Sequence, residues 1–166
     1  MEIFRLHHRI RRDPRIDTHL ALVARIFGVG KIYYSGDKDS GWEESISKIV
    51  KKFGGSLKLE YVEDDIRFIK YFKGCKAHLT VYGVDFRKKI EEIKKERKVL
   101  LIVGGEKVPG EVYELSDYNL SVSNQPHSEI AGIGIFLYEL FDGKFKKFKG
   151  ELEIRESERG KIILKK

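Results

Sequence analysis

The sequence has little sulfur and little proline. Its 166 residues include one Cys, one Met, one Trp and three Pro. A single thiol, Cys75, excludes an internal disulfide and a cysteine-rich zinc site, and such a residue is ordinarily a small buried apolar side chain. No apolar run approaches the roughly 18 residues that a membrane span needs, and the first residues lack a secretory pattern. We therefore expect a cytoplasmic protein that does not associate with a membrane.

Several familiar catalytic and nucleotide-binding motifs are also missing. There is no G-x-x-x-x-G-K-[ST] loop, no G-x-G-x-x-G after the first strand, and no G-x-S-x-G nucleophile motif. The stretch "FGVGK" is a partial match at the end of a predicted helix, which is the wrong context. The five histidines are His7, His8, His19, His78 and His127. They form no H-x-x-x-H pair, so we expect no metal site.

The chain is rich in charge. It carries 33 Lys and Arg against 26 Asp and Glu, a net charge of +7, with 36% charged and 41% hydrophobic residues. This composition predicts a globular fold. A basic surface favours polyanionic partners, but many Lys and Glu are also typical of hyperthermophile proteins. Charge alone therefore leaves nucleic acid binding open.

Strand and helix patterns alternate along the chain. Strands are predicted at 2–8, 31–36, 56–64, 77–83, 99–105 and 119–124, and helices at 15–30, 40–55, 64–74, 85–98 and 126–143. This alternation predicts an α/β fold with a mostly parallel sheet flanked by helices. The tail differs, because 151–166 reads as a β-hairpin that turns at Ser157–Gly160. We expect one domain over 1–150, with 151–166 as a hairpin extension of it.

Two loops with unusual polar content follow predicted strands. "VLLIVGG" ends at Gly104–Gly105, and "NLSVSN" ends at Asn124 before a helix with Pro126 in its first turn and Asn124 or Gln125 as its cap. In open α/β sheets, ligands bind beyond the carboxyl ends of strands, where glycine lets a ligand approach the backbone. The alternative is that the two glycines only turn the chain.

The run "HHRIRRDPRIDTHLALVARIFG" is the second unusual region. It gathers arginines at the end of the first strand and the start of a helix. Arginine matches phosphate oxygens in a bidentate manner, so this region is a candidate substrate-phosphate site. Arg15 and His19 are i, i+4 neighbours on one helix face. A solvated basic loop is the alternative for Arg11 and Arg12.

Three motifs, "RDPRIDTHLALVARIFG", "VGGEKVP" and "NQPHSEIAGIGIFL", together resemble the archaeal tRNA (cytidine-56) 2'-O-methyltransferases of the SPOUT superfamily. The resemblance covers nearly the whole chain. It implies a trefoil knot in the C-terminal half, S-adenosyl-L-methionine as cofactor, 2'-O-methylation of a tRNA ribose, and a homodimer. The helix after the third motif would lie at the interface, where Ala131, Gly132 and Gly134 permit close approach.

The resemblance also implies site residues. The superfamily's catalytic arginine falls on Leu22 and its asparagine on Ile16, so we predict Arg15, His19 and Arg25 as the catalytic groups. His7 and Ser123 stand where we expect glycine, and Asp17 where we expect threonine. The predicted cofactor-binding residues are Leu79, Gly104, Gly105, Glu106, Lys107, Val108, Val122, Ser123, Asn124, Gln125, Pro126, His127 and Ser128. Alternatives are a SPOUT enzyme that modifies rRNA and a non-catalytic α/β RNA-binding or nucleotide-binding module.

Overall fold

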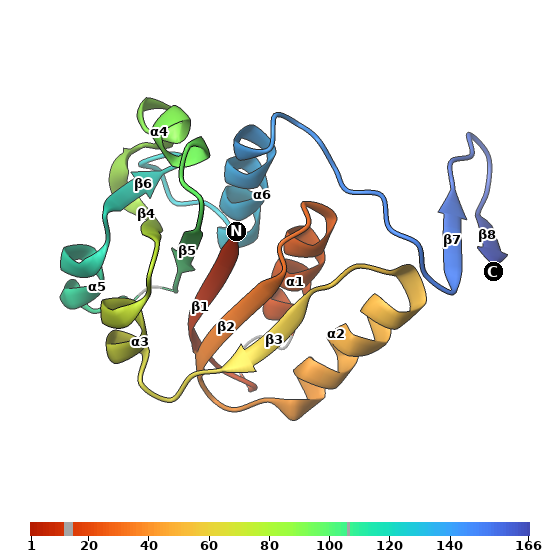
Figure 1. Cartoon of the computed structure of the whole chain (residues 1–166), viewed down its shortest axis with the longest axis horizontal. Helices are drawn as coiled ribbons and strands as arrows, with labels where there is room; N and C mark the ends of the chain where they lie inside the picture. Colours follow the sequence, from red (N-terminus) through yellow and green to blue (C-terminus); the bar gives the residue numbers. More distant parts are fainter. Residues whose placement is uncertain (12–14, 106) are drawn as a thin grey trace.

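The computed structural model describes residues 1–11, 15–105 and 107–166. Within this part, six parallel strands form one sheet in the order β3-β2-β1-β5-β4-β6 (Figure 1). The strands are β1 (Glu2–His8), β2 (Lys31–Gly36), β3 (Lys58–Tyr61), β4 (Cys75–Asp85), β5 (Val99–Val103) and β6 (Tyr118–Ser121). The helices are α1 (Ile16–Ile26), α2 (Ser40–Phe53), α3 (Asp65–Tyr71), α4 (Ile90–Lys94), α5 (Gly110–Leu115) and α6 (Glu129–Leu140). The predicted α/β class is thus confirmed.

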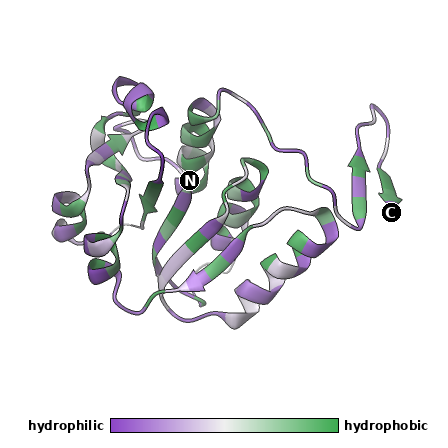
Figure 2. Ribbon diagram, viewed as in Figure 1, coloured by the Kyte–Doolittle hydropathy of each residue, from purple (hydrophilic) through white to green (hydrophobic). Residues whose placement is uncertain are grey.

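The core lies on both faces of the central strands β1 and β5. All of β5 is buried, as expected for a parallel strand covered on both sides, and Figure 2 shows it as hydrophobic along its length. Because side chains alternate, Ile3 and Leu101 face α1, α2, α4 and α6, while Phe4 and Ile102 face α3 and α5. Helices therefore cover both faces of the sheet.

Two predicted helices differ from the structure. The segment 85–98 forms only a 3-10 turn at Phe86–Lys88 and the short α4, because its narrow apolar stripe supports few turns. The helix predicted at 126–143 begins at Glu129, with the Ser128 side chain as its N-cap. The predicted cap at Asn124 or Gln125 and the first-turn position of Pro126 are therefore wrong. Helix α5 was not predicted at all.

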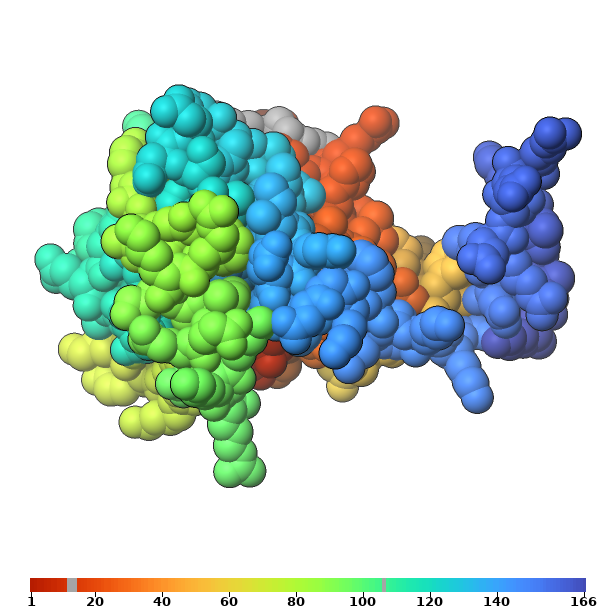
Figure 3. Space-filling view, turned by 90° about the horizontal axis from the view of Figure 1, so that it is seen from above, coloured from red at the N-terminus to blue at the C-terminus, as the bar shows by residue number. Residues whose placement is uncertain are grey.

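The C-terminal segment runs from α6 across the far ends of α1 and α2 to a separate hairpin. Lys146 N donates to Ile26 O (2.8 Å), which ties this segment to the end of α1. The predicted hairpin is confirmed as β7 (Leu152–Arg155) paired antiparallel with β8 (Ile162–Lys165). Its base lies against the end of α2, and the rest of the hairpin projects from the molecule in both views (Figures 1 and 3). Among the described residues, no helix has the length and apolar character to cross a membrane.

Candidate active site

Three loops leave the sheet at one edge. Leu79 on β4 pairs with Val103 on one side and with Leu120 on the other. Arg5 on β1 also pairs with Val103. Because these strands are parallel, the loops that follow β1, β5 and β6 leave the same end of the sheet, with β4 between β5 and β6. The structure thus brings together both predicted cofactor loops and the start of the arginine-rich segment.

The loop after β5 is tightly folded at its first glycine. A Cβ at Gly104 would lie 2.6 Å from Val108 Cγ2, so no larger residue fits there without a shift. Gly105 is exposed, and a Cβ there would lie 3.5 Å from Glu129 Oε1 at the start of α6. Lys107 is exposed and Val108 half-buried. The predicted cofactor contact Glu106 lies outside the described residues.

The loop after β6 is exposed but anchored by side chains. Asn124 Nδ2 donates to Val81 O (2.6 Å) and to Gly83 O (3.0 Å), across an irregular part of β4. Gln125 N donates to Ser123 Oγ (3.2 Å). The His127 ring lies against Gly132, where a Cβ would be 2.8 Å from its Cε1. Val122 packs on the core, while Ser123, Asn124, Gln125, Pro126, His127 and Ser128 are exposed.

These two loops fit the cofactor that the resemblance implies. In the described part of the chain, residues 104, 105, 107 and 108 and residues 122–127 make no backbone–backbone hydrogen bond. Their amide and carbonyl groups can therefore pair with the edge of an adenine ring. The half-buried side chains of Leu79, Val108 and Val122 offer apolar surface beside them.

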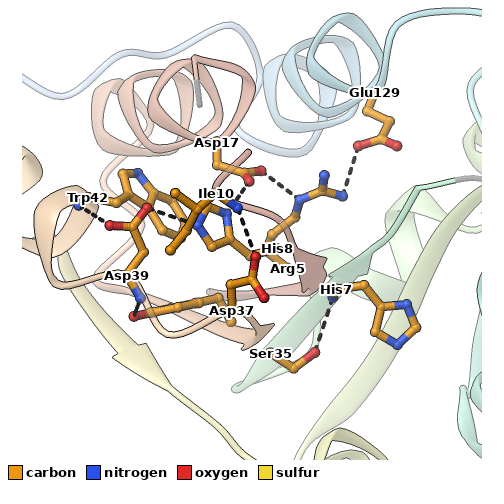
Figure 4. Close-up of polar contacts among 11 residues, drawn as sticks. Arg5, His7, His8, Ile10, Asp17, Ser35, Asp37, Asp39, Trp42 and Glu129 are labelled. Carbon is orange, nitrogen blue, oxygen red and sulfur yellow. Dashed lines mark hydrogen bonds and ion pairs between the residues drawn. The ribbon is translucent and has the colours of Figure 1, made fainter. Parts of the chain in front are cut away.

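A buried charge network lies next to this edge, and sequence reasoning missed it (Figure 4). Arg5 Nε donates to Asp17 Oδ1 (2.6 Å), and Arg5 Nη1 lies 2.9 Å from Glu129 Oε2. His8 Nδ1 lies 2.5 Å from Asp17 Oδ2. Arg5, His8 and Asp17 are all buried. The network thus joins β1, the first turn of α1 and the first turn of α6.

His8 extends the network to α2. Its Nε2 lies 3.0 Å from Asp39 Oδ2, while Asp39 Oδ1 caps α2 by accepting a hydrogen bond from Trp42 N (2.8 Å). The Trp42 ring stacks on the imidazole at 5.0 Å. Each ring nitrogen of His8 thus faces a carboxylate oxygen, so the ring is held between α1 and the start of α2. Beneath the network, burial and the hydrogen bond to Glu43 raise the pKa of Tyr34 above its ordinary range.

The chain bends sharply at the end of β1. His7 has a φ of +55°, a left-handed conformation in which any side chain is disfavoured. Its ring points away from the network, and Nε2 lies 3.2 Å from Asp65 Oδ2 (Figure 4). Gly36 (φ +95°) lies so close to His8 that a Cβ would collide with the His8 backbone. The left-handed backbone gives a physical reason for the glycine that we expected at position 7.

The three predicted catalytic residues do not lie together. Arg15 and His19 are exposed at the start of α1, and in the described part of the chain their side chains have no hydrogen-bond or ion-pair partner. Arg25 lies near the other end of this helix, about 15 Å along the axis from Arg15 at about 1.5 Å per residue. Its Nε and Nη2 donate to Gly54 O (2.8 Å) and Phe53 O (2.5 Å), and its guanidinium covers the Phe148 ring. Burial lowers the pKa of Arg25, which nonetheless stays cationic.

One signal could have revealed the network. Central parallel strands are ordinarily almost continuous apolar runs, yet "EIFRLHH" carries Arg5 among Ile3, Phe4 and Leu6. A charged residue at such a position needs a buried counter-charge. The identity of that partner is tertiary information, because Asp17 and Glu129 come from two different helices. In the described residues, no cluster of three His, Cys, Asp or Glu side chains is arranged to hold a metal ion.

Known proteins resemble this chain over nearly its full length. The sequence model of the family described as tRNA ribose 2'-O-methyltransferase, aTrm56, matches residues 53–164. A tRNA (cytidine(56)-2'-O)-methyltransferase of Methanocaldococcus jannaschii is 43% identical over 99% of this chain and 96% of that protein. The Archaeoglobus fulgidus protein of the same name is 44% identical over 99% of both chains. The Picrophilus torridus protein is 44% identical over 97% of this chain, which spans only 48% of its length.

Solved structures show the same fold. The TrmH/SpoU tRNA modifying enzyme of A. aeolicus is similar over 85% of this chain and 73% of its own, with a TM-score of 0.64 and 19% identity. The SpoU methyltransferase AviRb of Streptomyces viridochromogenes, in complex with AdoMet, matches over 86% of this chain and 57% of its own, with a TM-score of 0.62 and 15% identity. The chain therefore has the SpoU fold and belongs to the tRNA ribose 2'-O-methyltransferase family aTrm56.

Proposed function

We propose that this protein transfers a methyl group from S-adenosylmethionine to the 2'-hydroxyl of cytidine 56 in tRNA. The observation that carries this proposal is the identity of 43–44% with enzymes of that name over almost the whole of both chains. The two open loops beside Leu79 provide the cofactor pocket. We include Glu106 and the trefoil threading of the C-terminal segment in the proposal, on the strength of the family resemblance.

Bound between the two loops, the cofactor supplies an electrophilic methyl group on a sulfonium. The protein must then place a ribose oxygen in line with that methyl group, because positioning supplies much of the rate of such a displacement. The loops after β5 and β6 orient the donor through their backbone groups. The start of α1, which follows the loop after β1 at the same edge, faces the acceptor.

We assign the acceptor side to Arg15 and His19. Arg15 is always charged and is therefore suited to grip a phosphate or to stabilise the developing ribose oxyanion. His19, one helical turn further on, is a suitable acceptor for the hydroxyl proton. Both side chains are exposed at the start of α1. We withdraw Arg25 from the catalytic group and assign it to holding the C-terminal segment against α1 and α2.

We also propose a homodimer, built on the outer faces of α1 and α6. These helices pack on one another, as Gly134 beside Val23 shows. Four large apolar side chains on them are exposed in the single chain: Leu22, Ile26, Ile135 and Tyr138. Burial of such side chains in an interface is favourable. Arg15 and His19 share the stripe of α1 that carries Leu22 and Ile26, so the interface would run up to the catalytic groups.

The test uses labelled S-adenosylmethionine and three RNAs. They are a tRNA transcript with cytidine at position 56, the same transcript with a purine there, and an rRNA fragment. We expect label to appear only in the first RNA when the incubation is done in low salt. Transfer to the rRNA alone would favour the alternative SPOUT activity, and cofactor binding by calorimetry without any transfer would favour a non-catalytic module. The substrate also implies a cytoplasmic location, which we propose with it.

A further inference from the structure

The ion pair between Arg5 and Glu129 lies between the proposed cofactor loops and the start of α1. Glu129 is the first residue of α6 and directly follows the loop 122–128. Its Oε2 lies 2.9 Å from Arg5 Nη1, and its Oε1 lies beside Gly105 of the other cofactor loop. Arg5 in turn is held by Asp17 in the first turn of α1 (Figure 4). One chain of contacts thus connects both cofactor loops with the helix that carries Arg15 and His19.

Stability alone is a poor explanation for this arrangement. Removing a charge from water costs several kcal/mol per ion, and buried ion pairs can often be replaced by apolar residues at no loss of stability. Here the network places two buried side chains, Arg5 and His8, on the buried carboxylate of Asp17. What such a network provides is fixed geometry, since Asp17 on α1 contacts both Arg5 and His8, and the ion pair with Glu129 connects α6 to the same arginine.

We propose that Arg5 and Glu129 are positioning residues for methyl transfer. Their ion pair, oriented by Asp17 and His8, fixes the start of α6 and the preceding cofactor loop relative to α1. Neither residue is part of the predicted cofactor or catalytic set. The inference rests on the proposed function, because it concerns the alignment of the methyl donor with the ribose oxygen. A misplacement of about 1 Å in such a reaction can cost about a hundredfold in rate.

The test compares three single variants. Glu129→Gln and Arg5→Lys each weaken the Arg5–Glu129 ion pair while keeping a side chain of similar size. Glu43→Gln is the matched control, because Glu43 is also a half-buried carboxylate in the first turn of a helix, where it accepts a hydrogen bond from Tyr34 Oη (2.5 Å). Glu129 is partly exposed, so its replacement leaves the fold intact even if Arg5→Lys does not.

Two measurements are made on each protein. In hydrogen exchange without cofactor or RNA, we expect faster exchange of amides 122–128 in Glu129→Gln and Arg5→Lys but not in Glu43→Gln. In methyl transfer to tRNA, we expect kcat to fall about tenfold to hundredfold in the same two variants, with KM for tRNA changed less than about threefold. A variant that combines Glu129→Gln with Arg5→Lys should be no slower than the slower of the two single variants, because both changes weaken the same contact.

The outcomes separate this inference from the proposed function. If Glu129→Gln matches Glu43→Gln in both exchange and kcat, the positioning role is overturned while the proposed function stands. If wild-type protein methylates no tRNA, the proposed function falls and the catalytic part of the inference falls with it. The exchange data on the same proteins would still decide whether Arg5 and Glu129 hold the loop.

Discussion

The two ends of α1 carry similar residues that do different things. At its start, Arg15 and His19 are exposed without partners in the described part of the chain, and Asp17 contacts the buried Arg5 and His8. At its end, Arg25 donates to the last carbonyls of α2 and packs on Phe148. An arginine with all of its donors free can meet RNA, whereas one tied to backbone carbonyls serves the fold. Partners, and not residue type, distinguish the two roles.

The largest expected effect is the loss of stability on removing the Asp17 carboxylate at the start of α1. Asp17→Ala removes the carboxylate that contacts both Arg5 and His8 and leaves the Arg5 charge buried without this partner, so we expect a loss of about 3–5 kcal/mol in the free energy of unfolding. Urea unfolding measures it. Asp37→Ala is the control, because Asp37 is an exposed carboxylate that accepts a hydrogen bond from Ile10 N (3.1 Å). Equal free energies of unfolding of the two variants would show that the contacts of Asp17 contribute little to stability.

Arg15→Ala should leave stability unchanged and reduce activity. Loss of a group that stabilises developing negative charge typically costs about a hundredfold in rate. We therefore expect kcat/KM for tRNA to fall about a hundredfold, with the melting temperature within about 2 °C of wild type. Initial rates with labelled cofactor provide the measurement, and Arg15→Lys should recover part of the loss. Wild-type rates in the alanine variant would remove Arg15 from the site.

Arg25→Ala should reduce stability and leave activity nearly unchanged, the reverse of Arg15→Ala. Two half-buried carbonyls lose their donors, so we expect a loss of about 1–3 kcal/mol in the free energy of unfolding. The segment 144–150 should become sensitive to trypsin, while the transfer rate per folded molecule stays within about twofold of wild type. The readouts are limited proteolysis and initial rates. A protease-resistant variant with a hundredfold lower rate would return Arg25 to the catalytic group.

The smallest effect is expected at the bend before α1. His7→Gly removes the cost of a left-handed side chain, about 1 kcal/mol, but also loses the partly exposed contact with Asp65. We expect a net change within about 1 kcal/mol, measured by urea unfolding. His7→Val should cost more, because a branched side chain is less tolerant of this backbone. A large loss in the glycine variant would mean that the His7–Asp65 contact, and not the bend, dominates.

Local patterns predicted most of the fold. The apolar run of β5, the alternation before α3 and the hairpin at the C-terminus all appear in the structure, because each depends on neighbouring residues. Helix α5 was missed because Gly110 and the six-residue length give little periodic signal. The start of α6 was misplaced because proline favours a first turn, whereas Ser128 supplies the actual cap.

The site was only partly predictable. The two loops of the proposed cofactor pocket could be placed at one end of the sheet because both follow parallel strands, and their contact with the cofactor stays a prediction. The catalytic set was grouped by sequence proximity, and the structure separates Arg25 from Arg15. The charge network was missed, since Arg5, Asp39 and Glu129 are far apart in sequence and meet only through the packing of three helices on one sheet.

The most direct test of this account is the position of the modification in tRNA. A 2'-O-methyl group blocks alkaline cleavage of the next phosphodiester bond, because cleavage requires a free 2'-hydroxyl. After incubation with the protein and S-adenosylmethionine, an end-labelled tRNA transcript should give an alkaline ladder with one gap, directly after cytidine 56. An unbroken ladder from tRNA that has incorporated the methyl group would contradict ribose methylation, and a gap elsewhere would contradict cytidine 56 as the target.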